Sequence, residues 1–142
     1  MRPRWLLRFA ALTAVTATPS LRAQTDSATS PRPGAAGGYT EAQAARGQAV
    51  FRQACTSCHV TSQFTTPAFR QGWSGRTAAE MFEQIRTTMP LENPGRLRRQ
   101  EYADVLAYVF RLNGLPAGEA ELPADPEGLR RVRFQPPNPS RD

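Results

Sequence analysis

The stretch Cys55-Thr56-Ser57-Cys58-His59 contains both cysteines and the only histidine of this 142-residue chain. The pattern C-x-x-C-H is typical of a c-type haem attachment site. Two cysteines about one helical turn apart bind the two vinyl groups of one porphyrin as thioethers, and the following histidine places its imidazole under the ring to bind iron. The motif occurs once, so it predicts one covalent haem c.

Other interpretations leave a residue of the motif unexplained. A thioredoxin-like C-x-x-C gives His59 no role, and no βαβ pattern surrounds the motif. A zinc site takes about four nitrogen or sulfur ligands, whereas the two cysteines and one histidine of this chain provide three. A disulfide between Cys55 and Cys58, with only two residues between them, would be strained.

The first 23 residues have the layout of a secretory signal peptide. Three arginines among the first eight residues precede a short apolar run over residues 9–17, and cleavage is expected after Ala23. The run is too short to span a bilayer, which takes about 20 residues; a retained amphipathic anchor is the alternative. Thiols must meet haem outside the reducing cytoplasm, so we expect a periplasmic or otherwise exported protein.

Cleavage of the leader would remove much of the positive charge. Four of the 18 basic residues lie in residues 1–23, which leaves 14 against 12 acidic residues. The net charge that remains is close to zero and gives no reason to expect a nucleic-acid partner.

The rest of the chain divides by composition. Residues 24–38 are rich in Ser, Thr, Pro, Gly and Ala and predict a flexible linker. Residues 39–118 form the expected domain, which is small for a self-sufficient core and would gain apolar interior from a covalent haem. Residues 119–142 contain five prolines and predict an extended tail that wraps the domain through Leu122 and Phe134, with its last eight residues disordered.

The apolar spacing within the domain predicts helices and no convincing strand. The helices are expected over residues 40–55, 77–87 and 99–112. The first two begin with capping boxes, which pair Thr40 with Gln43 and Thr77 with Glu80. Residues 59–76 are predicted to form a loop, because threonine, glycine and proline are frequent there.

Three patches of the sequence are similar to class I cytochromes c with one haem. They are Gly47-x-x-x-Phe51 with the C-x-x-C-H motif, Trp73-x-Gly75-x-Thr77 through Ile85 to Met89-Pro90, and residues 102–108 with Asn113-Gly114-x-Pro116-Ala117-Gly118. The resemblance covers about residues 39–118. The middle patch resembles small periplasmic cytochromes and cytochrome domains that accept electrons from quinoprotein dehydrogenases.

The resemblance implies an all-α fold, in which about three main helices surround one haem and the first helix crosses the last. A glycine inside a helix costs about 1 kcal/mol relative to alanine. Close approach of the crossing helices explains Gly47, with Phe51 and Tyr108 packed around the contact. A tolerated glycine in an ordinary amphipathic helix is the alternative.

The second axial ligand of the iron is a methionine in this interpretation. Met81 and Met89 are the candidates, because Met1 belongs to the leader. Met81 lies on an apolar stripe, where methionine usually packs, whereas Met89 precedes Pro90 in a loop and matches the Met-Pro ligand of the family. The resemblance therefore implies His59/Met89 ligation, which raises the reduction potential. An open or exchangeable sixth position is the alternative.

Two further cofactor-binding residues are expected around the haem. Pro67 offers its carbonyl to the Nδ1–H of His59, a bond of the kind that orients metal-bound histidines. Trp73 resembles the tryptophan whose indole N–H meets a haem propionate. Arg70 or Arg76 is either the partner of a propionate or, as is more common, a solvated arginine. A plain loop proline and simple core packing are the alternatives for Pro67 and Trp73.

Together these features predict a one-electron carrier rather than an enzyme. The expected partners are a periplasmic dehydrogenase and a downstream oxidase or carrier, with no nucleic acid and no membrane span in the mature chain. The basic residues Arg96, Arg98 and Arg99 are either a docking patch for an acidic partner or a solvated face. The alternative function is a haem-based sensor or peroxidase-like enzyme with an open iron position, and the lack of a second histidine argues against it.

Overall fold

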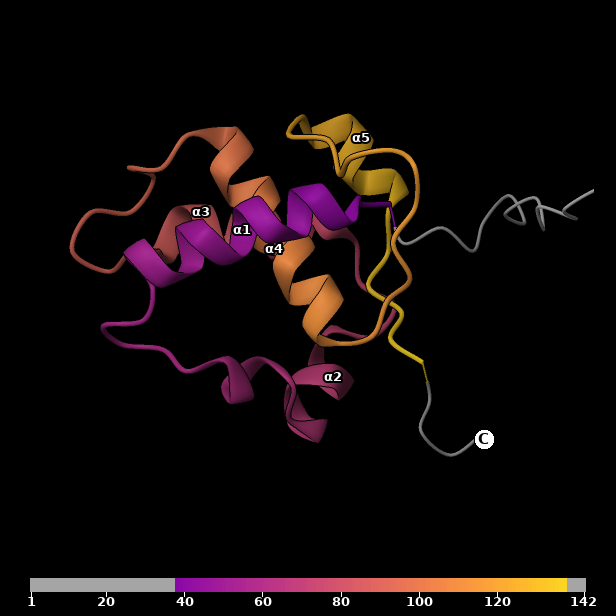
Figure 1. Ribbon diagram of the computed structural model, residues 1–142, viewed down its shortest axis with the longest axis horizontal. Helices are drawn as coiled ribbons and strands as arrows, with labels where there is room; N and C mark the ends of the chain where they lie inside the picture. Colours follow the sequence, from indigo (N-terminus) through magenta and orange to yellow (C-terminus); the bar gives the residue numbers. More distant parts are fainter. Residues whose placement is uncertain (1–37, 138–142) are drawn as a thin grey trace, which may run out of the picture. The chain divides into compact units, whose positions relative to one another are not determined.

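The computed structural model describes residues 38–137, which form a helical fold (Figure 1). Its elements are α1 (Glu41–Ala54), the short 3₁₀ helix η1 (Thr61–Phe64), α2 (Pro67–Trp73), α3 (Ala78–Thr88), α4 (Arg99–Leu112) and α5 (Pro126–Arg131). Within residues 38–137, β-structure is limited to an isolated bridge between Thr77 and Arg133, so the predicted all-α class is confirmed. The predicted signal peptide and residues 24–37 of the predicted linker lie outside the described residues.

The first and last of the three long helices cross, with α1 lying across α4 (Figure 1). Gly47 of α1 sits against the backbone of Asp104, and a Cβ atom at Gly47 would collide with the Asp104 carbonyl group. Phe51 and Tyr108 pack beside the crossing, with their ring centroids 5.5 Å apart. The predicted close crossing is confirmed, and it explains why a glycine is needed in mid-helix.

The predicted N-caps of α1 and α3 are present, but they differ in construction. At α3, Thr77 Oγ1 accepts the N–H of Glu80 (3.3 Å) and the Glu80 carboxylate accepts the N–H of Thr77 (2.8 Å), which completes the capping box. At α1, Thr40 Oγ1 accepts the N–H of Gln43 (3.1 Å). The buried Gln43 amide instead exchanges two hydrogen bonds with the backbone of Leu122, at 2.9 and 2.7 Å. The second half of the capping box predicted at Thr40 is therefore wrong.

The predicted loop over residues 59–76 contains two helical segments, η1 and α2, so that prediction is wrong. Thr66 Oγ1 accepts the N–H of Phe69 at 3.1 Å, and Pro67 is the first residue of α2. Proline is favourable at this position, because its missing N–H would have no helical partner there. The pair Thr66-Pro67 is therefore a helix start.

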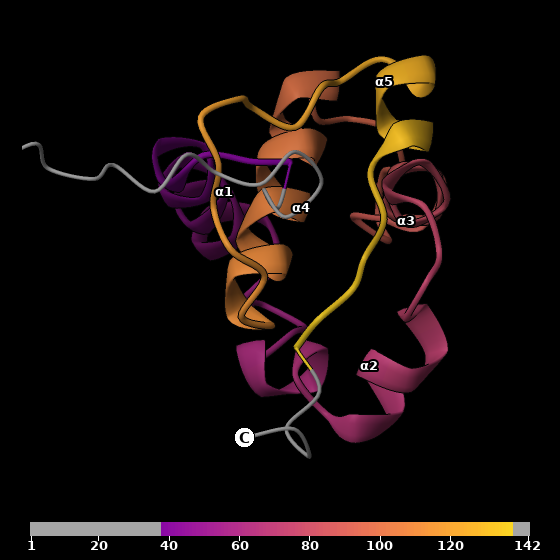
Figure 2. The same ribbon diagram turned by 90° about the vertical axis from the view of Figure 1, so that its right-hand side faces the viewer.

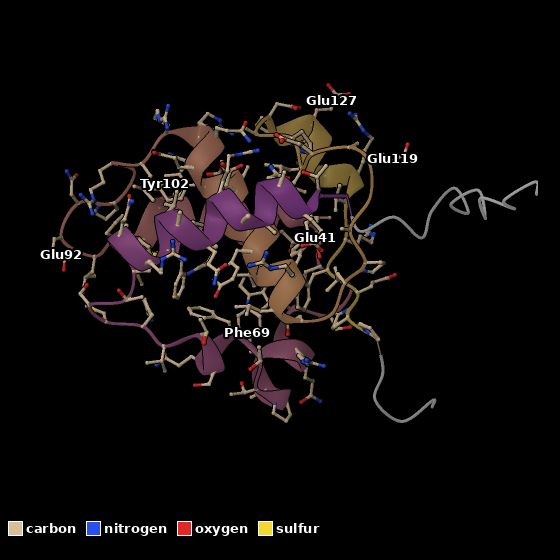
Figure 3. All side chains as sticks on the ribbon, in the orientation of Figure 1. Glu41, Phe69, Glu92, Tyr102, Glu119 and Glu127 are labelled. Atoms are coloured by element: carbon tan, nitrogen blue, oxygen red, sulfur yellow. The ribbon has the colours of Figure 1, made fainter. Side chains whose placement is uncertain are left out.

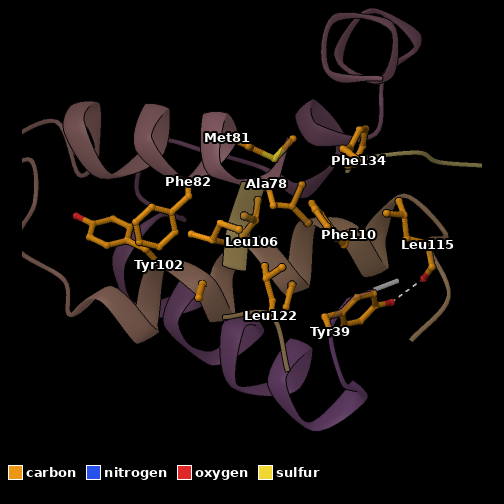
Figure 4. Packing of buried hydrophobic residues seen from close by; sticks show 14 of the residues in the cluster. Tyr39, Ala78, Met81, Phe82, Tyr102, Leu106, Phe110, Leu115, Leu122 and Phe134 are labelled. Atoms are coloured by element: carbon orange, nitrogen blue, oxygen red, sulfur yellow. Dashed lines mark hydrogen bonds between the residues drawn. The ribbon is translucent and has the colours of Figure 1, made fainter. Parts of the chain in front are cut away.

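Helix α4 is the centre of the hydrophobic core, and residues 102–110 are all buried. Figure 4 shows Leu106 and Phe110 of α4 packed together with Met81 of α3 and with Tyr39. The Tyr39 hydroxyl donates to the Leu115 carbonyl at 2.7 Å, which ties the chain before α1 to the chain after α4. None of the helices in residues 38–137 is long and apolar enough to cross a membrane.

Residues 119–137, here called the C-terminal segment, return over this core. Leu122, Leu129 and Phe134 are completely buried, and Figure 2 shows the segment running from α5 past α3 towards α2. Phe134 exchanges backbone hydrogen bonds with the α2–α3 connection, donating to Arg76 and accepting from Gly75 at 2.9 Å each. The segment therefore supports the turn from which α3 starts.

The C-terminal segment differs from the predicted extended tail because it contains α5. Asp125 caps this helix by accepting the N–H of Gly128 at 2.7 Å, and Pro126 is its first residue. Residues 135–137, predicted to be disordered, are described by the structure, whereas 138–142 lie outside the described residues.

Candidate functional site

An apolar cavity of about 330 Å³ lies beside the C-x-x-C-H motif. Its walls come from the end of α1 and the chain that follows it, from α2, α3 and α4, and from the loop between α3 and α4. The residues that line it include Cys55, Cys58, His59, Phe64, Phe69, Trp73, Met81, Met89 and Tyr102. The structure therefore brings both cysteines, the histidine and both candidate methionines to one cavity, whose size is within the range of small-molecule sites.

The way in which α1 ends determines the position of His59. Cys55 donates its N–H to the carbonyl of Phe51, and His59 donates its N–H to the carbonyl of Cys55, both at 2.9 Å. The motif therefore forms a turn directly after the helix. The His59 ring meets Phe64 with centroids 5.6 Å apart, and Phe64 in turn packs on Phe51 at 5.7 Å. These rings hold the imidazole at the edge of the cavity.

Nδ1 of His59 lies 3.3 Å from Oε1 of Gln63, and the same oxygen accepts the N–H of Val60 at 3.1 Å. Pro67, the predicted acceptor, is exposed and does not line the cavity. Because Pro67 is the first residue of α2, its carbonyl points along the helix axis. The structure thus places Gln63, and not Pro67, at Nδ1 of His59. The sequence signal for Gln63 is its position four residues after the histidine.

Met81 and Met89 both line the cavity, but in different settings. Met81 lies within α3, is 2% exposed and belongs to the hydrophobic core. Met89 follows the last residue of α3, is half-buried and donates its N–H to the carbonyl of Ile85 at 2.8 Å. The setting of Met81 is that of a packing residue, whereas Met89 lies at the end of a helix, where its side chain is not required by the core.

Trp73 is the last residue of α2 and lines the cavity, as expected. The Arg76 guanidinium stacks on its ring, 4.2 Å from the ring centroid. Arg70 lies between the lining residues Phe69 and Trp73, and its buried Nε has no hydrogen-bond partner among the described residues. A buried donor of a charged group is costly when unpaired, so an anionic group such as a haem propionate fits beside α2.

The three arginines of the predicted docking patch have different partners. Arg99 donates from Nε to the Ala124 carbonyl at 3.0 Å, and its guanidinium lies over the ring of Phe82. Arg98 pairs with the carboxylate of Glu101 at 3.0 Å. Arg96 has no side-chain partner among the described residues. Of the three arginines, Arg96 is therefore the one whose charge faces solvent.

The charge of Arg96 also acts on the attachment site. Burial raises the pKa of the Cys55 thiol, and the positive charge of Arg96 opposes this shift. Cys58, in contrast, is exposed. The two sulfur atoms therefore occupy different environments, one inside the cavity wall and one at its rim.

The sequence did not identify three features of the cavity. Phe64 and Phe69 supply aromatic walls, and their rings meet edge to face at 5.7 Å. The Tyr102 hydroxyl donates to the carbonyl of Met89 at 2.8 Å. Aromatic residues in a predicted loop and on an apolar helix stripe give no separate signal for such roles.

The residues that line the cavity fit a c-type haem. Two thiols lie next to an imidazole, and a thioether lines the same apolar space. Helix α2, which contributes Phe69 and Trp73 to the wall, also carries the buried Arg70 Nε, which has no partner among the described residues. Residues 42–109 match the family described as cytochrome C oxidase, cbb3-type, subunit III. This part of the chain is a class I cytochrome c domain. The cytochrome c domain carries covalent haem c and functions in electron transfer, so the predicted fold and cofactor are confirmed. No curated protein and no solved structure matches the chain.

Proposed function

We propose that this cytochrome c domain is an exported one-electron carrier, in which Cys55 and Cys58 attach the haem and His59 and Met89 bind its iron. One observation carries the proposal: the two thiols, the imidazole and the thioether all line the same apolar cavity. The bound haem supplies one-electron redox chemistry, and a soft, neutral thioether ligand raises its potential.

The residues of the chain hold this group and limit what reaches it. Phe64, Phe69 and Trp73 present aromatic surface to the cavity, which lowers the local dielectric and keeps water away. If His59 and Met89 both bound the iron, they would leave a small molecule no ready access to it. The arrangement therefore supports electron transfer rather than substrate chemistry.

The partners follow from the same reasoning. A periplasmic dehydrogenase is proposed as the electron donor, and the description of the matched family, a subunit of a cytochrome c oxidase, favours an oxidase complex on the acceptor side. The exported location is supported by the leader-like composition of residues 1–23. Arg96, together with the 75%-exposed Leu91 of the same loop, marks the side of the domain proposed for docking.

Two leucine variants of the haem-loaded protein test the ligand assignment. Leucine keeps the volume of methionine but has no ligand atom. We expect Met89→Leu to abolish the weak near-infrared band typical of a Met–Fe(III) bond and to lower the potential, while Met81→Leu keeps both. Haem should remain with the polypeptide in acidified acetone in both variants.

The opposite result, with the band lost only in Met81→Leu, would show that the ligand assignment is wrong. Rapid binding of carbon monoxide to the native reduced protein would indicate an open sixth position. That outcome would replace the carrier with a haem-based sensor or peroxidase-like enzyme.

A further inference from the structure

A buried tyrosine holds the backbone of the proposed sixth ligand. Tyr102 is in the first turn of α4 and is 1% exposed, and its hydroxyl donates to the carbonyl of Met89 at 2.8 Å. The two residues are 13 positions apart in the sequence. The bond therefore connects the end of α3 to the start of α4 across the loop between these helices.

This bond completes the backbone anchoring of Met89. The N–H of Met89 already donates to the carbonyl of Ile85 at 2.8 Å, as the last bond of α3. The following residue, Pro90, has no N–H, and residues 91–96 are exposed. Met89 is thus fixed by α3 on its amide side and by Tyr102 on its carbonyl side, directly before an exposed stretch of chain.

The tyrosine is itself rigidly placed. Its ring packs edge to face on Phe82 of α3 (Figure 4), and the two ring centroids are 6.0 Å apart. The Arg99 guanidinium covers the ring of Phe82 at 4.9 Å. A buried tyrosine hydroxyl requires a hydrogen-bond partner, and here the Met89 carbonyl is that partner. Figure 3 labels Tyr102 beside the beginning of α4.

We infer that Tyr102 is a positioning residue that holds Met89 in its ligating conformation, an inference that rests on the proposed His59/Met89 ligation. A thioether is a weak ligand, so the fraction of molecules with a dissociated Met89 depends on how well the protein holds this residue. Loss of one ordinary hydrogen bond should raise that fraction roughly tenfold. The same fraction sets the apparent affinity of any external ligand that competes for the iron.

Imidazole binding to the oxidised, haem-loaded protein measures this fraction. We expect Tyr102→Phe to bind imidazole roughly tenfold more tightly than the wild type. Tyr108→Phe is the matched control: Tyr108 is also buried in α4, but its hydroxyl has no hydrogen bond among the described residues, and it does not line the cavity. This control should bind imidazole with wild-type affinity.

A second measurement separates positioning from general stability. Heating should remove the near-infrared band of Tyr102→Phe well before the far-ultraviolet circular dichroism signal, whereas a merely structural role would lower both transitions together. Wild-type imidazole affinity in Tyr102→Phe, or a joint shift of both transitions, would overturn the inference.

The Met89→Leu variant distinguishes a failure of the Tyr102 role from a failure of the proposed His59/Met89 ligation. If Met89→Leu binds imidazole tightly and Tyr102→Phe does not, the ligand assignment stands and the role of Tyr102 is wrong. If Met89→Leu binds imidazole no better than the wild type, the proposed ligation itself fails.

Discussion

His59 and Met89 reach the same cavity from segments that the rest of the chain supports in different ways. The hydrogen bonds of His59 are local, from its N–H to the Cys55 carbonyl and from Nδ1 to Gln63. Met89 is held at long range, because its carbonyl accepts a bond from the buried Tyr102 of α4. The histidine side is thus arranged by a turn, and the methionine side is tied to the hydrophobic core.

This difference is consistent with the proposed function, in which His59 and Met89 are kept near the iron in different ways. His59 adjoins two cysteines that would be covalently linked to the haem, so the histidine stays near the iron even if the protein around it is loose. Met89 has no covalent link, and only the folded protein keeps its thioether in place. Damage to the core should therefore affect Met89 ligation and leave the haem attached.

The largest expected effect comes from Phe134, which packs in the core and whose backbone binds the turn from which α3, the helix that leads to Met89, starts. Its completely buried ring packs on Phe110 at 5.5 Å and on Phe69 at 6.0 Å. Truncation of a buried phenylalanine costs about 3–5 kcal/mol. We expect Phe134→Ala to lower the free energy of unfolding by this amount in denaturant titrations, and to weaken the near-infrared band while the haem stays attached.

Val60→Ala is the control for Phe134→Ala, because Val60 is 61% exposed and does not line the cavity. Surface substitutions of this kind usually change stability by less than about 0.5 kcal/mol. If Phe134→Ala lowers the free energy of unfolding by less than about 1 kcal/mol, the C-terminal segment does not support the domain.

The sequence was sufficient for features that depend on local chemistry or on a steric requirement. The C-x-x-C-H spacing, the Thr77/Glu80 capping box and the need for glycine at position 47 each depend on a few neighbouring residues or on one close contact. The end of α4 follows from Asn113-Gly114, a pair that commonly terminates helices, and Asn113 is its C-cap. Apart from the role of Gly47, which the family resemblance implies, these predictions did not require knowledge of what packs on the other side.

The misses arose where a local signal had two interpretations. The sequence predicts a loop at Thr66-Pro67 and an extended tail at Asp125-Pro126, because proline often interrupts regular structure. In the fold, each pair is an N-cap followed by the first residue of a short helix. The apolar contacts that stabilise α5 come from distant parts of the chain, so periodicity over six residues could not indicate it.

The sequence also does not predict which hydrogen-bond partner a side chain has when several are available. Gln43 had a helix-capping role available, but its amide binds the backbone of Leu122, 79 residues away. Nδ1 of His59 had the carbonyl of Pro67 as its expected acceptor, but the acceptor is Gln63. In both cases the selection depends on tertiary placement, which sequence spacing does not give.

The N-caps of α1 and α3 give a prediction of intermediate size, because α1 leads to His59 and α3 leads to Met89. Loss of a threonine cap costs about 1 kcal/mol, so Thr40→Ala and Thr77→Ala should lower the free energy of unfolding by similar amounts at neutral pH. Only the cap of α3 should depend on pH. Glu80 accepts hydrogen bonds from the backbone and hydroxyl of Thr77, and these bonds, with a smaller effect of Arg76, lower the pKa of its carboxyl group.

The sign of the pH effect follows from the lowered pKa. Stabilisation by Glu80 is fully present above the usual glutamate range and is lost as the pH falls through the lower folded-state pKa. The stability difference between the wild type and Glu80→Gln, measured by denaturant unfolding, should therefore shrink at acid pH. Thr40→Ala provides the comparison, since its cap has no carboxylate. A difference that stays constant down to acid pH would show that the Glu80 bonds do not form in solution.

The smallest expected effect on stability concerns Gln63, which is exposed beside His59, so its substitution should change unfolding by less than about 0.5 kcal/mol. Its effect should appear in the reduction potential. An acceptor at Nδ1–H makes a histidine ligand more basic, which favours oxidised iron. Gln63→Glu should therefore lower the potential and Gln63→Ala should raise it. Gln53→Glu, at an exposed position of α1 with no side-chain hydrogen bond among the described residues, adds the same charge without the contact. If Gln63→Glu and Gln53→Glu lower the potential equally, the effect is one of charge alone and the Gln63 contact does not tune His59.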